Sequence, residues 1–228
     1  MSWESSSEYY RLTNEIIKAK LGGFHSAKSM MVSVDFDEIE RLQHSAQWEE
    51  AGQILAEAAQ SLERAGADFI LLCTNTMHKV ADDIESAITI PFLHIADATA
   101  EKIRAAGLQK IGLLGTRFTM EQDFYKGRLS QNYGLQVLVP DEAEREIVHR
   151  VIYDELVLGK INPNSKALYL KIIDQMVAAG AQGVILGCTE IGLLVQQSDT
   201  NIPLFDTATL HAEAAVDWAL IDEALSDT

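Results

Sequence analysis

The chain has few cysteines, few prolines and no long apolar run, and each shortage excludes a class of protein. Two cysteines in 228 residues cannot build the disulfide framework of a small secreted domain, so we expect free thiols and a cytoplasmic protein. No apolar run approaches the roughly 20 residues of a membrane-spanning helix, which predicts no membrane partner. Four prolines and 14 glycines are too few for a linker-rich or low-complexity chain.

Positive charge is also scarce. The chain carries 18 lysines and arginines against 34 aspartates and glutamates, a net charge of −16. Nucleic-acid binding needs clustered basic residues, so the composition predicts no nucleic-acid partner. An anionic small molecule can still bind where backbone N–H groups, hydroxyls and a few cations gather.

The two cysteines occur in two similar stretches of sequence. In each stretch a glycine closes a helical segment, an apolar run follows, and a Cys-Thr pair stands at its end, at Cys73 and at Cys188. A short run opened by a proline comes next in both copies, at Pro91 and Pro203. Cys188 follows Cys73 by 115 positions, a period too long for a solenoid, which predicts a duplicated α/β lobe.

Apolar strand-like runs alternate with helical patterns along the whole chain. This alternation predicts an α/β fold with two pseudo-symmetric lobes, each a mainly parallel sheet flanked by helices, and an active site in the cleft between them. We place the first lobe at residues 1–97, with residues 208–228 packing back on it. The second lobe is expected at residues 98–207.

The first copy of the repeat is shorter at its start than the second. The second copy opens with a strand at residues 111–116, whose image in the first copy would end at Met1. We therefore expect that the first lobe lacks its opening strand, or that residues upstream supply it, because a lobe without that strand exposes β edges and core surface. A strand is also predicted at residues 29–34.

Each cysteine lies between an apolar strand and the start of a helix. Backbone N–H groups and the helix dipole stabilise an anion there, which predicts a thiol pKa below its usual value of about 8.5. A lone cysteine is more often a small core residue, but two at equivalent strand ends favour chemistry. A disulfide would need Cα atoms within about 7 Å. Zinc would need further Cys or His ligands at suitable spacing, so no metal is expected.

Hydroxyl and amide side chains surround both cysteines in the sequence. Asn75, Thr76 and Thr189 are good helix caps and good carboxylate donors. Thr116 and Thr119 follow the strand at residues 111–115 and could serve a carboxylate as well. Two histidines, His78 and His94, admit either a catalytic or a structural role.

These motifs resemble those of the aspartate/glutamate racemase family. The resemblance covers nearly the whole chain and rests on CTNT at Cys73, GCTE at Cys188 and the LGT that ends at Thr116. The MSWES start and the LHIAD stretch from Leu93 resemble the enterobacterial aspartate/glutamate racemase group. Members of the family open with a strand and a Gly-Gly before the residue that matches Met1. The resemblance implies two lobes, a homodimer, no cofactor, and cysteines that act on the D face (Cys73) and the L face (Cys188).

We therefore predict a cofactor-independent racemase that interconverts L and D aspartate or glutamate, with Cys73 and Cys188 as thiol and thiolate. The alternatives are a related Cys-dependent isomerase, such as a hydantoin racemase or maleate isomerase, and a catalytically disabled amino-acid-binding protein. The predicted substrate-binding residues, some of them from the family alone, are Met1, Arg41, Gln43, Thr74, Asn75, Thr76, Thr116, Thr119, Lys166 (or Lys160), Thr189 and Glu190.

Overall fold

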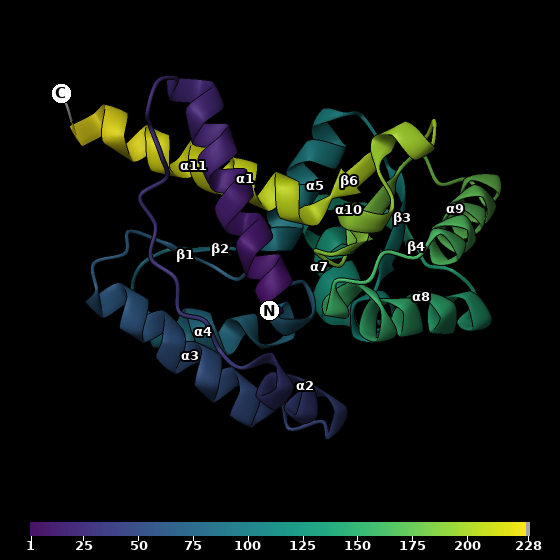
Figure 1. Ribbon diagram of the computed structural model, residues 1–228, viewed down its shortest axis with the longest axis horizontal. Helices are drawn as coiled ribbons and strands as arrows, with labels where there is room; N and C mark the ends of the chain where they lie inside the picture. Colours follow the sequence, from purple (N-terminus) through teal and green to yellow (C-terminus); the bar gives the residue numbers. More distant parts are fainter. Residues whose placement is uncertain (227–228) are drawn as a thin grey trace. The chain divides into compact units, whose positions relative to one another are not determined.

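Three helices precede the first strand, at least one helix follows every strand, and every strand pair is parallel (Figure 1). The computed structural model describes residues 1–226, with side chains for residues 1–221. The chain separates into two compact units. The first comprises Met1–Cys73, Met77–His94 and the chain from His211, and the second comprises Thr74–Thr76 and Ile95–Leu210. The predicted α/β class with parallel sheets and flanking helices is confirmed.

The first unit contains a short parallel sheet surrounded by helices. In β1 and β2, Ile70 pairs with Phe92 and Leu71 with Leu93. Residues of α2, α3 and α4 form its main apolar core together with Ile70 and Met77. Its elements are α1 (Trp3–Leu21), α2 (Phe36–His44), α3 (Trp48–Arg64), β1 (Ile70–Leu71), a 3-10 helix η1 (Thr76–Val80), α4 (Ala81–Ala87), β2 (Phe92–Leu93) and most of α11 (Thr207–Ser226).

The second unit contains a parallel sheet with strand order β4-β3-β5-β6. Alternate strand side chains point to opposite faces, so Leu113 packs with α5 and α7, while Leu114 packs with α8, α9 and α10. Its elements are α5 (Ile95–Ala105), β3 (Lys110–Gly115), α6 (Arg117–Glu121), α7 (Asp123–Tyr133), β4 (Gln136–Leu138), α8 (Glu142–Asp154), η2 (Leu156–Leu158), α9 (Pro163–Ala178), β5 (Val184–Gly187), α10 (Ile191–Leu194), η3 (Gln197–Asp199) and β6 (Leu204–Asp206).

The sequence repeat has a structural counterpart in these sheets. Ile70 donates its backbone N–H to the carbonyl of Pro91 at 2.9 Å, and Val184 donates to the carbonyl of Pro203 at the same distance. In both units, the strand that precedes the cysteine therefore pairs with the proline-opened strand that follows it.

The predicted strand at residues 29–34 is wrong. Within the described chain this segment has no regular secondary structure, and Met30, Met31 and Val32 are 47%, 60% and 44% exposed. A run of β-prone residues forms a strand only where a neighbouring strand completes its hydrogen bonds. In the part of the chain that the structure describes, no helix is long and apolar enough to cross a membrane.

A buried tyrosine–histidine pair joins α1 to α11. The Nε2 of His211 lies 2.9 Å from the carbonyl oxygen of Leu93, which can only accept, so Nε2 carries the proton. Burial lowers the pKa of His211 to about 4, so the ring is neutral at pH 7. Nδ1 is then an acceptor, and the hydroxyl of Tyr9 donates to it at 2.8 Å.

Tyr9→Phe is expected to lower the free energy of unfolding by about 1–2 kcal/mol, because it leaves Nδ1 of His211 buried without a donor. The measurement is urea denaturation at pH 7. Tyr10→Phe is the matched control, since Tyr10 is 61% exposed and its loss should cost under about 0.5 kcal/mol. Equal effects of the two substitutions would contradict the role of the buried pair.

Candidate active site

The carboxyl ends of β3 and β5 lie side by side in the sheet of the second unit. Gly115 and Gly187, the last residues of the two strands, pair with each other, so Thr116 and Cys188 start from adjacent points. The chain after β3 runs through α6 and α7 to β4 on one side of this point, and the chain after β5 runs through α10 to β6 on the other side. Such a divergence is where open α/β sheets bind ligands.

The two glycines allow the strands to approach closely at this point. A Cβ on Gly115 would lie 2.7 Å from the carbonyl oxygen of Gly187. A Cβ on Gly187 would lie 2.7 Å from the carbonyl oxygen of Leu114 and 2.8 Å from Cδ1 of Leu113. These contacts are too short for real carbon atoms, so the strand ends require glycine at both positions.

Three buried threonines form a chain of hydroxyls at this edge. Oγ1 of Thr76 lies 2.9 Å from Oγ1 of Thr116, which lies 3.2 Å from Oγ1 of Thr119. Thr116 also caps α6, because its side chain accepts the backbone N–H of Thr119. The structure thus brings together three of the predicted substrate-binding residues.

Asn75 precedes Thr76, and only one of the two polar atoms of its side chain is hydrogen-bonded. The hydroxyl of Thr207 donates to the carbonyl oxygen of Leu186 at 2.9 Å, so its oxygen is left to accept from Nδ2 of Asn75, also at 2.9 Å. This relay fixes the orientation of the amide. Oδ1 of Asn75 is buried and has no hydrogen-bond partner, and such an oxygen is an acceptor available to a ligand.

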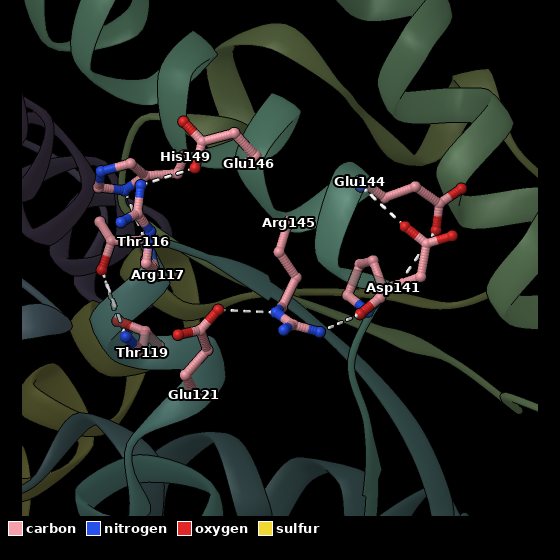
Figure 2. A network of polar contacts seen from close by, with 10 residues as sticks. Thr116, Arg117, Thr119, Glu121, Asp141, Glu144, Arg145, Glu146 and His149 are labelled. Carbon is pink, nitrogen blue, oxygen red and sulfur yellow. Dashed lines mark hydrogen bonds and ion pairs between the residues drawn. The ribbon is translucent and has the colours of Figure 1, made fainter.

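Ion pairs hold the start of α6 against α8 (Figure 2). Arg117 pairs with Glu146 at 2.6 Å, and its backbone N–H donates to Nδ1 of His149 at 3.2 Å. Arg145 pairs with Glu121 at 2.8 Å. The helix that Thr116 caps is therefore held in place by side chains outside the buried edge.

A surface hollow of about 740 Å³ adjoins these ion pairs and contains none of the predicted site residues. Carboxylates dominate its lining, which disfavours an anionic ligand there. The lining residues are Arg117, Glu121, Asp141, Glu142, Ala143 and Glu146.

Cys73 follows β1 at the corresponding edge of the first unit. Its carbonyl oxygen accepts from the Met1 nitrogen at 2.6 Å and from the Ser5 hydroxyl at 2.8 Å. Thr74 is buried and belongs to the second unit together with Asn75. The chain therefore passes from one unit to the other directly after the first thiol. Both cysteines are free thiols.

Cys188 lies against a buried carboxylate. Its Sγ is 3.0 Å from Oε2 of Glu190, and the Thr189 hydroxyl donates to the same oxygen at 2.8 Å. Cys188 and Glu190 are only 8% and 4% exposed. Glu190, predicted to bind substrate, thus contacts the candidate catalytic thiol itself.

The expected lowering of the thiol pKa values is wrong. Burial raises the pKa of Cys73 to about 11. Burial and then the negative charge of Glu190 raise the pKa of Cys188 well above its ordinary value. The helical segments that follow are short, since α10 spans four residues, and desolvation outweighs their dipoles.

Two of the predicted cations each lie beside an aspartate. Arg41, on α2, is 3.1 Å from Asp37, and its side chain is 70% exposed. Lys166, on α9, pairs with Asp199 at 2.7 Å. Gln43 is buried in the first unit, where its Nε2 lies 2.9 Å from Sδ of Met77. Lys160 donates its backbone N–H to the carbonyl of Glu155. Their roles toward a substrate stay predictions.

Comparison with known proteins assigns the family. The family model described as Asp/Glu/Hydantoin racemase matches residues 1–215. The chain belongs to the Asp/Glu/hydantoin racemase family. A candidate Asp/Glu racemase of known structure from Yersinia pestis is 56% identical to this family member, with 96% of each chain covered and a TM-score of 0.89.

Two further relatives span most of this racemase-family chain. An aspartate racemase homologue of known structure from Pyrococcus horikoshii OT3 is 37% identical, covers 95% of this chain and 94% of its own, and has a TM-score of 0.83. The broad specificity amino-acid racemase RacX of Bacillus subtilis (strain 168) is 26% identical over 172 residues, 74% of this chain and 72% of the relative. The family and these relatives support an amino-acid racemase of the Asp/Glu type.

Sequence reasoning missed one residue of this racemase-family site. Thr207 is fully buried and orients Asn75, 132 positions away in the chain. The Asp-Thr-Ala stretch that begins at the last residue of β6 marks the start of a helix in the sequence, but nothing local links it to Asn75. Among the described residues, no group of three or more His, Cys, Asp or Glu is arranged to hold a metal ion.

Proposed function

We propose that this protein racemises aspartate or glutamate without a cofactor, using Cys73 and Cys188 as its two acid–base groups. One observation carries the proposal: in a member of this family, each of two free thiols lies within two residues of the carboxyl end of a parallel strand. The proposed setting is a cytoplasmic homodimer.

The reaction moves one proton onto and one proton off the substrate Cα. One cysteine as thiolate takes the α proton and becomes a thiol, and the electron pair left on Cα delocalises into the α-carboxylate. The other cysteine as thiol gives its proton to the opposite face and becomes a thiolate. Two groups serve two faces, so the configuration inverts. The family resemblance assigns Cys73 to the D enantiomer and Cys188 to the L enantiomer.

The polar side chains of the second unit are suited to the rest of the amino acid. Oδ1 of Asn75 is an acceptor and fits the substrate ammonium group better than its carboxylate. The hydroxyls of Thr76, Thr116 and Thr119 can donate to the α-carboxylate, which gains charge in the transition state. For the second carboxylate of the substrate we propose Lys166 or Lys160, with Arg41 as the other candidate.

The test is exchange of the α proton in deuterated water, followed by NMR for a panel of L and D amino acids. We expect exchange and racemisation of aspartate or glutamate but not of alanine, valine or lysine. Hydroxylamine, which captures pyridoxal aldehydes, should leave the rate unchanged.

The exchange rate should also rise about tenfold per pH unit between pH 7 and pH 10. A thiol with a pKa of about 11 is thiolate in only about one molecule in 10⁴ at pH 7, and this fraction grows as the pH rises.

In the panel of amino acids, exchange confined to neutral amino acids would overturn the proposed substrate class. No exchange with any amino acid would overturn the proposed racemase activity.

A further inference from the structure

Glu190 and Cys188 form a buried pair whose geometry has a chemical consequence. One carboxylate oxygen of Glu190 accepts from both the Cys188 thiol and the Thr189 hydroxyl. The hydroxyl holds that oxygen in place. A sulfur 3.0 Å from a carboxyl oxygen makes a favourable contact only if one of the two groups carries a proton, because two negative charges would repel each other. The thiol is ordinarily the weaker acid of the two, with a pKa of about 8.5 against about 4.3 for glutamate, so the proton stays on sulfur.

We propose that Glu190 is a positioning residue that keeps Cys188 protonated in the resting protein, so that Cys188 starts the cycle as the proton donor. The inference rests on the proposed two-cysteine function and goes beyond it by making the two thiols unequal.

The surroundings of Cys188 reinforce this bias. Tyr169, on α9, is fully buried, and burial raises its pKa well above the ordinary value. Tyr169 is therefore a neutral phenol and offers no charge that would stabilise a thiolate at Cys188. The Glu190 carboxylate therefore opposes ionisation of this thiol without compensation from Tyr169.

Cys73 lacks this carboxylate contact. Burial accounts for the rise of its pKa to about 11, whereas Glu190 adds to burial at Cys188. The first thiolate should therefore form at Cys73, with Cys188 ready to donate its proton to the opposite face of Cα. After that donation the Cys188 thiolate faces the Glu190 carboxylate, and their repulsion favours return of the proton.

The experiment measures alkylation of each cysteine by iodoacetamide as a function of pH, with mass spectrometry of the two cysteine peptides. Only the thiolate reacts, so the profile reports each thiol pKa. Glu190→Gln keeps the shape and the acceptor oxygen but removes the charge. We expect Cys188 to react at least about tenfold faster at pH 8, which corresponds to a pKa lower by about one unit or more.

Cys73 is the internal control, and its alkylation rate at pH 8 should change less than about twofold. Glu142→Gln is the matched charge control, because Glu142 is exposed on α8 and its loss should leave both cysteines unchanged. An unchanged Cys188 profile in Glu190→Gln would overturn the inference, as would an equal response of Cys73.

Glu190→Asp covers the case in which the glutamine variant does not fold. Aspartate keeps the charge but places it one methylene farther from the sulfur. A smaller acceleration of alkylation, confined to Cys188, would support the inference, and an unchanged Cys188 rate would contradict it. Alkylation does not need a substrate, so the two proposals can fail separately. If no amino acid is racemised but the Cys188 profile shifts, the racemase proposal fails and the role of Glu190 on the thiol stands.

Discussion

Cys73→Ala and Cys188→Ala should each lower the racemisation rate by at least about 10³-fold, within the range that general acid–base groups contribute. Each variant removes the group that serves one face of Cα, so inversion cannot be completed. Racemisation is followed by circular dichroism at pH 8 for both enantiomers. Far-UV spectra confirm that the variants are folded.

Two further measurements separate this mechanism from simple damage. Each single variant keeps one thiol, which can still exchange the α proton of one enantiomer without inversion, and the two variants should prefer opposite enantiomers. The double variant should be little slower in racemisation than either single one, because groups that act as a unit are not additive. Racemisation within tenfold of the unsubstituted protein in either single variant would exclude the two-base mechanism.

Gly187→Ala should lower the free energy of unfolding by up to about 3 kcal/mol and reduce racemisation with it. The added Cβ would lie 2.7 Å from a backbone oxygen of β3, so the two central strands must move apart. Cys188 is the next residue and would move with β5. The measurements are urea denaturation and the racemisation rate.

Gly127→Ala is the control for the same chemical change. Gly127 lies inside α7, where a Cβ would meet a side-chain carbon at 3.3 Å, and alanine favours a helix by up to about 1 kcal/mol. This variant should be as stable as the unsubstituted protein or slightly more stable. If the two glycine variants are equally stable and active, the close approach of β3 and β5 is not needed at the site.

Much of the fold could be predicted because its signals are local. The apolar run of β3 and the glycines that end neighbouring helices identify strands and helices from adjacent residues alone. The segment at residues 29–34 shows the limit, since its β-prone residues form no strand in the described chain. The short helix α2, which Asp35 caps, is not among the predicted elements.

The chemistry of the site was only partly predictable. Repetition of the Cys-Thr pair in two similar stretches was enough to single out Cys73 and Cys188. Their pKa direction was not, because a helix start is visible in the sequence while desolvation depends on everything packed around the sulfur. Arg41 and Lys166 were chosen by type and rough position, and the structure pairs each with a nearby aspartate.

By itself the sequence determined the α/β class, the duplicated strand–thiol pattern and the family, because periodicity and motifs are properties of neighbouring residues. Only the tertiary structure decided which polar atoms lack a hydrogen-bond partner and which side chains lie against the thiols. The relay through Thr207 turns Asn75 so that its oxygen is the unpaired atom, and folding buries Glu190 against Cys188 instead of leaving it in solvent. Burial and contacts between residues far apart in the chain set these outcomes, since they decide which hydrogen bonds are satisfied and which charges lose their water.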